Sequence, residues 1–512
     1  MRLRRSAGLL LHPTSLPGPE GIGTLGDDAE RWLSWLHASG FRTWQVMPLG
    51  PTGYGDSPYQ SFSAFAGNPY LISLSRLVEE GFLPSGAIRE AQAADGHAVD
   101  YGTVIPQKIQ ALTVAADRFD DVATPEDRRD FERFCDTHAS WLDDYALFMA
   151  LKDAHDGRPW RDWPQPLRDR DAAALAAFQD DHARELARHK LWQYWFTAHW
   201  RTVKRHAEQC GVQVVGDLPI FVALDSADVW ANPSQFDLDE SGAPRHVAGV
   251  PPDYFSATGQ LWGNPLYRWD VMEAQGFTWW IDRLKRTFDM VDVVRIDHFR
   301  GFEAYWEIPA GEPTAENGRW QPGPKQAFFD AVRSALGDAP IVAEDLGVIT
   351  PEVDALRTEN DLPGMRVLQF AFAGNAADPY LPHNYDRNTV VYTGTHDNDT
   401  TRGWFEAAPV EEQDAVRRYL GRSGDHVAHD LIRLALASVA DTAVVPLQDC
   451  LDLGSDARMN TPGSTQGNWS WRFTWDDIPA WLGTFLADMN QQYGRVEPEA
   501  SRDTVYRQSK LD

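Results

Sequence analysis

Short apolar runs recur along this chain, and several of them end in a charged residue. The clearest is the stretch VDVVRIDHFRG at 291–301, where valines and an isoleucine give way to Arg295, Asp297, His298 and Arg300. Uninterrupted β-branched runs are typical of strands that are buried on both faces, as in a parallel sheet. Arg295 and Asp297 are two residues apart, so on a strand their side chains point the same way.

Eight runs of this kind are separated by helical patterns. We expect strands at 7–11, 43–49, 212–215, 291–296, 340–343, 365–370, 389–393 and 443–447. Eight alternating strand and helix units predict an α/β fold, a single (β/α)8 TIM barrel over residues 1–512. About 65 residues follow the last strand, fewer than the roughly 100 of an independent β-sandwich, so we expect no C-terminal β-sandwich.

Two segments are much longer than the roughly 30 residues of one strand–helix–strand unit. Residues 75–210 have a helical pattern, and 168–210 contain neither Gly nor Pro, so we expect a mainly helical insertion between strands 2 and 3. Residues 218–275 are rich in Gly, Pro, Asn and aromatic residues and predict a loop-rich insertion between strands 3 and 4. Its aromatic content argues against disorder.

The net charge of −28 is unusual for a chain whose composition is otherwise ordinary. Such a field repels anions, which argues against nucleic acid or an anionic membrane as a partner and is compatible with a neutral substrate. Cys135, Cys210 and Cys450 are far apart and form no zinc or disulfide pattern. With no signal-like start and no run of membrane length, we expect a cytoplasmic protein.

Four expected strands end close to a carboxylate, and the carboxyl ends of barrel strands carry the chemistry of such folds. These carboxylates are Asp217, Asp297, Glu344 and Asp397. Each one alone is compatible with a helix cap, and the pair of Arg295 and Asp297 with an inert ion pair. Four carboxylates at one face instead favour cation binding or the cleavage of glycosidic bonds.

A metal site is the weaker of these two alternatives. Magnesium sites usually keep company with phosphate-binding motifs, and the sequence contains none. His298 and His396 lie beside the acids and leave a zinc or iron site open, but Arg295 would repel a cation next to Asp297. We therefore expect no metal and no other cofactor.

Glycoside chemistry gives three of the carboxylates different tasks. Asp297 stays ionised beside Arg295 and suits a nucleophile. Glu344 follows the apolar run PIVA, so its pKa is expected to be raised, as a general acid requires. Asp397 would hold sugar hydroxyls more tightly in the distorted transition state.

Several long segments carry a family resemblance. VVRIDHFRG, IVAEDLG and YTGTHDN resemble the catalytic segments of the α-amylase clan. Together with GYGDSPYQSFSAFAGNPY, VVGDLPIFVALDSADVW, PPDYFSATGQLWGNPLY and ARMNTPG…GNWSWR, they resemble the 4-α-glucanotransferases of glycoside hydrolase family 77, the amylomaltases or disproportionating enzymes. The resemblance runs in order from about residue 8 to residue 473.

The resemblance implies a retaining double displacement through a covalent glycosyl–aspartate intermediate. It makes Asp297 the nucleophile, Glu344 the acid/base and Asp397 the stabiliser of the transition state. It implies substrate contacts from Tyr59, Arg295, His298 and His396 at the cleavage point and from Asp217, Asp253, Trp262 and Asn468 along the glucan groove. Tyr54 and Tyr101 match a possible second glucan site.

The implied activity moves α-1,4-glucan segments from starch or malto-oligosaccharide donors to malto-oligosaccharide or glucose acceptors. An α-glucan hydrolase with the same three carboxylates remains an alternative, and so does a non-catalytic α-glucan-binding barrel. The aromatic loop at 250–267 gives a reason for transfer, because a lid over the acceptor would raise its local concentration and exclude water.

Overall fold

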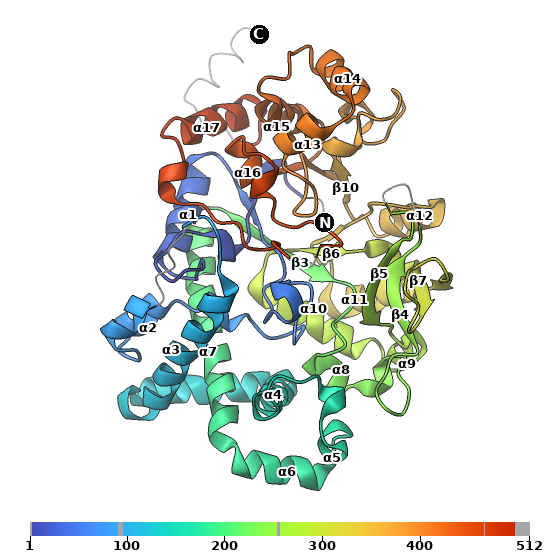
Figure 1. Ribbon diagram of the computed structural model, residues 1–512. Helices are drawn as coiled ribbons and strands as arrows, with labels where there is room; N and C mark the ends of the chain where they lie inside the picture. The colour runs from blue at the N-terminus through green and yellow to red at the C-terminus, as the bar shows by residue number, and fades with distance from the viewer. Residues whose placement is uncertain (1–2, 91–95, 253–255, 465, 497–512) are drawn as a thin grey trace, which may run out of the picture.

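The centre of the molecule is a sheet of eight parallel strands in the order β10-β11-β12-β1-β2-β3-β6-β9 (Figure 1). The computed structural model describes residues 3–90, 96–252, 256–464 and 466–496. The strands are β1 (Ser6–Leu10), β2 (Thr43–Gln45), β3 (Gln213–Pro219), β6 (Val293–Asp297), β9 (Ile341–Ala343), β10 (Gly364–Val367), β11 (Thr389–Tyr392) and β12 (Thr442–Pro446). The amide of Ala343 bonds the carbonyl of Pro363 and joins the two ends of the sheet. The prediction of a (β/α)8 barrel is confirmed.

The barrel interior is filled with side chains. Seven strands, together with Met47 two residues after β2, contribute to one buried apolar cluster: Leu10, Met47, Val215, Val293, Val342, Met365, Val367, Val390, Tyr392 and Val444. Alternate residues of the strands other than β10 point outward into a second, larger core beneath the helices. Both faces of the sheet are therefore buried, which explains why the strands are continuous apolar runs.

Amphipathic helices cover the outer face of the sheet. They are α1 (Asp27–Ala38), α10 (Thr278–Met290), α11 (Lys325–Leu336), α12 (Pro351–Glu359), α13 (Thr401–Ala407), α14 (Val410–Leu420), α15 (Val427–Ala437) and α17 (Leu482–Gln492). In α10, for example, the buried residues Trp280, Leu284 and Thr287 recur at helical spacing and form one stripe.

Helices fill most of the chain between β2 and β3. They are α2 (Leu74–Glu79), α3 (Tyr101–Val122), α4 (Pro125–Ala154), α5 (Gln165–Arg168), α6 (Ala172–Asp181) and α7 (Ala183–Gln209). Helix α4 begins with a capping box in which Thr124 and Asp127 bond each other's backbone amides. Figure 1 shows α4, α5 and α6 extending away from the barrel, whereas α7 returns to pack against α1.

A second sheet of four antiparallel strands flanks the barrel and was not predicted. Its order is β5-β4-β7-β8, formed by β5 (Gln260–Pro265), β4 (His246–Val250), β7 (Ala304–Pro309) and β8 (Arg319–Pro322). The segment between β3 and β6 thus contains two strands and the helices α8 (Ala227–Ala231) and α9 (Trp269–Ala274), as well as loops. The strands β7 and β8, from the chain after β6, complete the sheet (Figure 1).

Residues 447–464 and 466–496 pack as helices and short turns against the barrel. They contain α16 (Leu447–Cys450) and α17, and α17 contacts α1 and α15. None of the helices in the described part of the chain is both long and apolar enough to cross a membrane.

A buried ion pair ties the helical insertion to the barrel. Lys108 of α3 is 0% exposed and pairs with Glu20, which is 1% exposed and lies in the loop after β1. Glu20 also accepts the amides of Leu74 and Ser75, and Lys108 donates to the carbonyl of Ile72 at 2.7 Å. Removing one member of such a pair leaves a buried charge without its partner.

We expect Glu20→Gln to destabilise the protein by about 3–5 kcal/mol, because the Lys108 ammonium loses its counter-ion in a dry environment. The double variant Glu20→Gln/Lys108→Met should recover most of this loss. Thermal unfolding followed by circular dichroism measures both. A double variant whose melting temperature is no higher than that of Glu20→Gln would contradict this account of the pair.

Candidate active site

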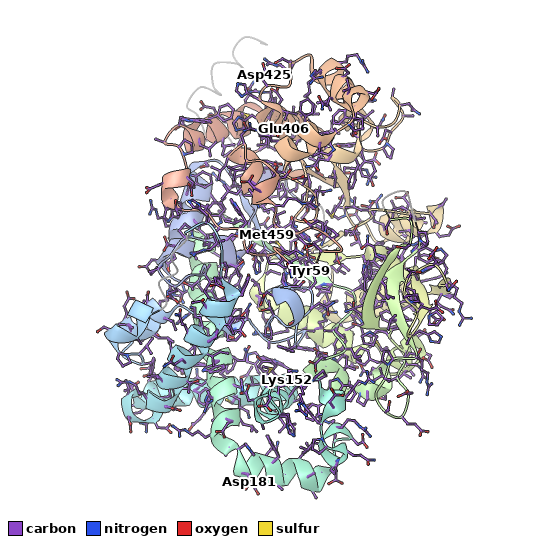
Figure 2. The ribbon with its side chains drawn as sticks, in the orientation of Figure 1. Tyr59, Lys152, Asp181, Glu406, Asp425 and Met459 are labelled. Carbon is purple, nitrogen blue, oxygen red and sulfur yellow. The ribbon has the colours of Figure 1, made fainter. Side chains whose placement is uncertain are left out.

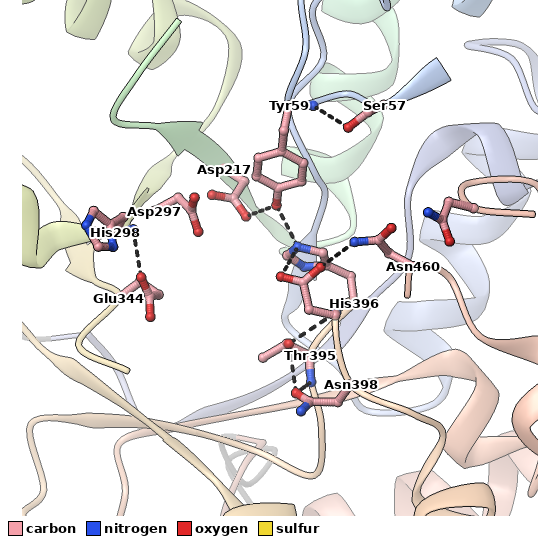
Figure 3. Close-up of polar contacts among 12 residues, drawn as sticks. Ser57, Tyr59, Asp217, Asp297, His298, Glu344, Thr395, His396, Asn398 and Asn460 are labelled. Carbon is pink, nitrogen blue, oxygen red and sulfur yellow. Dashed lines mark hydrogen bonds and ion pairs between the residues drawn. The ribbon is translucent and has the colours of Figure 1, made fainter. Parts of the chain in front are cut away.

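The carboxylates predicted from the strand ends meet at one mouth of the barrel (Figure 3). Asp297 is the last residue of β6 and Glu344 directly follows β9. Asp217 lies inside β3, opposite Arg295 in the register of the sheet. Asp397 lies in the loop after β11. The structure therefore brings these four carboxylates together at one end of the barrel.

A single guanidinium links two of the acids. Arg295 is 3% exposed. Its Nη1 atom donates to Asp217 Oδ2 at 2.5 Å and lies 3.0 Å from Asp297 Oδ1. Burial disfavours the charged form of Arg295, but the acids around it outweigh burial and raise its pKa. A fixed positive charge thus lies beside Asp297, as the spacing of the two residues predicted.

Glu344 is held by backbone amides. Its Oε2 accepts the amide of His298 at 2.6 Å, and its Oε1 accepts the amide of Leu346 at 2.9 Å. His298 has a left-handed backbone with φ 53°, which is uncommon for a residue with a side chain and turns its amide toward Glu344. Strained backbone of this kind is concentrated at functional sites.

The environments of Glu344 and Asp297 separate their acidities. Burial, followed by the charge of Asp297, raises the pKa of Glu344 to about 8. Burial also raises the pKa of Asp297, to about 6, although Arg295 opposes the shift. The spacing of Arg295 and Asp297 in the sequence indicated the effect of Arg295, but not that burial has the larger effect on the pKa of Asp297. At neutral pH Glu344 is mostly protonated and Asp297 mostly ionised.

Tyr59 connects Asp217 to His396. Its hydroxyl donates to Asp217 Oδ2 at 2.8 Å and lies 2.8 Å from His396 Nε2 (Figure 3). Since the hydroxyl proton goes to the carboxylate, Nε2 of His396 must carry the proton of the second bond. The two rings also stack, with centroids 5.2 Å apart. Tyr59 packs against the interior cluster to which Met459 belongs, and Figure 2 shows both residues near the middle of the molecule.

Asp397 is bound by residues that the sequence did not point to. Asn460 Nδ2 donates to Asp397 Oδ1 at 2.6 Å, and Arg458 donates to the carbonyl of Asp397 at 2.8 Å. His396 Nε2 lies 3.4 Å from Asp397 Oδ2. Both new partners belong to the segment ARMNTPG, whose Arg and Asn are the only signal that could have identified them.

Aromatic rings border the carboxylates on two sides. Trp262 of β5 packs edge-on against His298 at 4.8 Å, and Trp469 lies 5.7 Å from Tyr59 and 5.8 Å from His396. Burial lowers the pKa of His298 to about 3, so this ring is neutral, and its Nε2 has no protein partner among the described residues. A neutral imidazole nitrogen that is buried beside an acid can bond a sugar hydroxyl.

The remaining predicted contacts are less closely joined to this group. Asn468 precedes Trp469 and uses its side chain within its own loop, to Thr461 and Ser464. The hydroxyl of Tyr101 donates to the carbonyl of Trp469 at 2.8 Å. Tyr54 lies in a short 3-10 helix, Tyr54–Asp56. The side chain of Tyr54 and the whole of Asp253 lie outside what the structure describes.

The arrangement suits acid and nucleophile chemistry on a neutral ligand. It combines an ionised carboxylate, a protonated carboxyl group and several hydroxyl-binding groups. Among the residues that the structure describes, no cluster of three or more His, Cys, Asp or Glu side chains has the form of a metal site.

Comparisons with known proteins agree with this chemistry. The profile of the 4-alpha-glucanotransferase family matches residues 11–477. The chain is 54% identical to a 4-alpha-glucanotransferase of Thermus thermophilus over 97% of this chain and 100% of that protein. It is 51% identical to one from Synechocystis over 96% and 98% of the two chains. An amylomaltase from Streptococcus agalactiae, solved in complex with acarbose, is 38% identical with a TM-score of 0.93, over 96% of this chain and 100% of that one.

We expect Asp297→Asn to lower the pKa of Glu344, because the substitution removes a neighbouring negative charge that opposes ionisation of Glu344 and leaves Arg295 less compensated. The carboxyl stretch of Glu344, isolated by infrared difference against Glu344→Gln, measures the titration. Asp397→Asn is the matched control, because Asp397 is not among the groups with the largest effects on the pKa of Glu344. Equal titration of Glu344 in both variants would contradict the coupling.

Proposed function

The chain belongs to the 4-alpha-glucanotransferase family, and from that premise we propose that Asp297, Glu344 and Asp397 carry out the transfer by double displacement. The observation that carries the assignment is the contrast between Asp297, paired with Arg295 and mostly ionised, and Glu344, buried and mostly protonated. Two carboxyl groups with separated pKa values are the pair that retaining glycosidases require.

In the first step, an oxygen of Asp297 attacks the anomeric carbon of an α-1,4-glucan. The bond to the glycosidic oxygen breaks as Glu344 gives that oxygen its proton, which leaves a glycosyl ester on Asp297. In the second step, the 4-hydroxyl of an acceptor glucan attacks the same carbon. Its proton passes to the Glu344 carboxylate, and Asp297 leaves as a carboxylate, so the configuration is retained.

The other residues hold the sugars. Asp397 would bind hydroxyls of the reacting sugar and strengthen that contact in the transition state. Tyr59, Arg295, His298 and His396 surround the cleavage point in this proposal, with Asp217, Asp253, Trp262 and Asn468 along the groove and Tyr54 and Tyr101 at a second contact. The contact between Trp262 and His298 supports a role for residues 218–275 as the acceptor side, where an aromatic cover would exclude water.

The donors in this proposal are α-1,4-glucans, and the acceptors are malto-oligosaccharides or glucose. We also propose that the enzyme acts in the cytoplasm. The support for this location is that Cys135, Cys210 and Cys450 are all free thiols.

Incubation with maltotriose tests the reaction. We expect glucose and a ladder of longer oligosaccharides, with a constant number of reducing ends, because every bond cleaved is replaced by a bond to a sugar acceptor. Chromatography of the products together with a reducing-end assay measures this. A steady rise in reducing ends would mean hydrolysis, and no turnover would mean binding alone.

The pH dependence of kcat/KM tests the roles of the two carboxyl groups. We expect kcat/KM to rise as Asp297 ionises, near a pKa of about 6, and to fall as Glu344 loses its proton, near about 8. α-Glucosyl fluoride provides the control, because fluoride leaves without a proton. With this donor, formation of the intermediate should lose the alkaline limb, and Glu344→Gln should form it almost as fast as the parent enzyme. An alkaline limb that persists with the fluoride donor would exclude Glu344 as the acid.

A further inference from the structure

The loop between β11 and α13 positions Asp397 differently from the other two carboxylates. Asp297 ends a strand and Glu344 adjoins one, whereas Asp397 lies well beyond Tyr392, the last residue of β11. Its side chain is 47% exposed. Because a loop is less rigid than a strand, the position of Asp397 must be fixed by contacts outside the barrel sheet.

Asp449 of α16 provides such contacts at both ends of this loop. Its Oδ2 accepts the hydroxyl of Thr393 at 2.5 Å and the hydroxyl of Thr401 at 2.7 Å, and its Oδ1 accepts the amide of Thr401 at 2.7 Å. Thr393 is the first residue after β11, and Thr401 is the first residue of α13. One carboxylate therefore joins the start and the end of the segment that carries His396 and Asp397.

The burial of this carboxylate makes the three bonds important. Asp449 is 1% exposed, and both threonines are 0% exposed. Asp449 forms no ion pair within the described residues, so the three hydrogen bonds must offset the cost of burying it. A buried acceptor of this kind disfavours any loop conformation that leaves it unpaired.

A second side chain supports the same loop from the other neighbouring strand. Gln369 follows β10 and is 5% exposed. Its side-chain Nε2 donates to the carbonyl of Asp399 at 2.9 Å, and its backbone amide donates to the carbonyl of Thr393 at 3.3 Å. The loop is thus held from β10 on one side and from β12 on the other, and Asp449 provides the contacts from the β12 side.

We propose that Asp449 is a positioning residue for Asp397: by binding Thr393 and Thr401 it fixes the loop so that Asp397 meets the reacting sugar. This inference rests on the proposed role of Asp397. Asp449 does not touch the sugar and transfers no proton. Its effect is to keep Asp397 where the hydroxyl contacts tighten in the transition state.

Steady-state kinetics on maltotriose test the proposal. We expect Asp449→Ala to lower kcat by about 10²-fold, the size of loss that a displacement of about 1 Å can cause, with little change in KM. Asp449→Asn keeps an oxygen for the Thr401 amide and should lose less. Thr393→Val removes one donor and should shift kcat in the same direction, which keeps the test open if Asp449→Ala does not fold.

A double-variant cycle separates positioning from general stability. If Asp449 acts through Asp397, adding Asp449→Ala to Asp397→Asn should cause almost no further loss of rate. Thr389→Val is the matched control, since Thr389 is 4% exposed at the opposite end of the same strand, and it should leave kcat unchanged. All rates are taken where circular dichroism shows the variants folded.

Three outcomes would overturn the proposal. The first is an unchanged kcat in Asp449→Ala with only a lower melting temperature. The second is a cycle in which the two losses multiply, because Asp449 would then act independently of Asp397. The third is an Asp397→Asn variant as active as the parent enzyme. This last result would reject the proposed function of Asp397, whereas the first two leave that function intact.

Discussion

The buried charge of Arg295 is the constraint on which the site depends. A guanidinium that is 3% exposed must be surrounded by acceptors, and here these are Asp217 and Asp297. Asp217 in turn accepts the hydroxyl of Tyr59, which lies in contact with His396. The chain of contacts therefore runs from β6 through β3 and the loop after β2 to the loop after β11. A change at any one of these positions alters the electrostatics of the nucleophile, because the groups share one desolvated region.

The position of Arg295 gives the two carboxyl groups of this desolvated region their different acidities. Burial raises both pKa values, so it cannot by itself distinguish a nucleophile from an acid. Arg295 bonds Asp297 directly, whereas Glu344 is bonded, among the described residues, only by two backbone amides and also experiences the charge of Asp297. Ionised Asp297 thus helps to keep Glu344, the proposed acid, protonated, and the order of the two pKa values follows from the position of one guanidinium.

Those features that depend on periodicity could be predicted from the sequence. The eight barrel strands and the carboxylates at their ends are such features, because a strand buried on both faces leaves a continuous apolar run. The second sheet was missed because β5 reads QLWGNP and β8 reads RWQP, with little apolar alternation and a Gly or Pro in each. Asn460 and Trp469 were missed as site residues because they reach it from a loop after β12, and loop contacts over such distances leave no periodic signal.

The three carboxylates therefore differ in what holds them, and this difference has a physical consequence. The position of Asp297 is fixed by the pairing of β6 with its neighbouring strands. That of Glu344 is fixed by β9 and by two backbone amides. Asp397 inherits its position from side chains: Asn460 bonds its carboxylate, and Asp449 bonds the ends of its loop. Asp297 and Glu344, the proposed nucleophile and acid, are thus placed by the barrel sheet, while Asp397, the proposed stabiliser of the transition state, lies on a loop. Side-chain anchors can be altered without breaking the barrel, so the grip on the sugar can vary independently of the acid and the nucleophile.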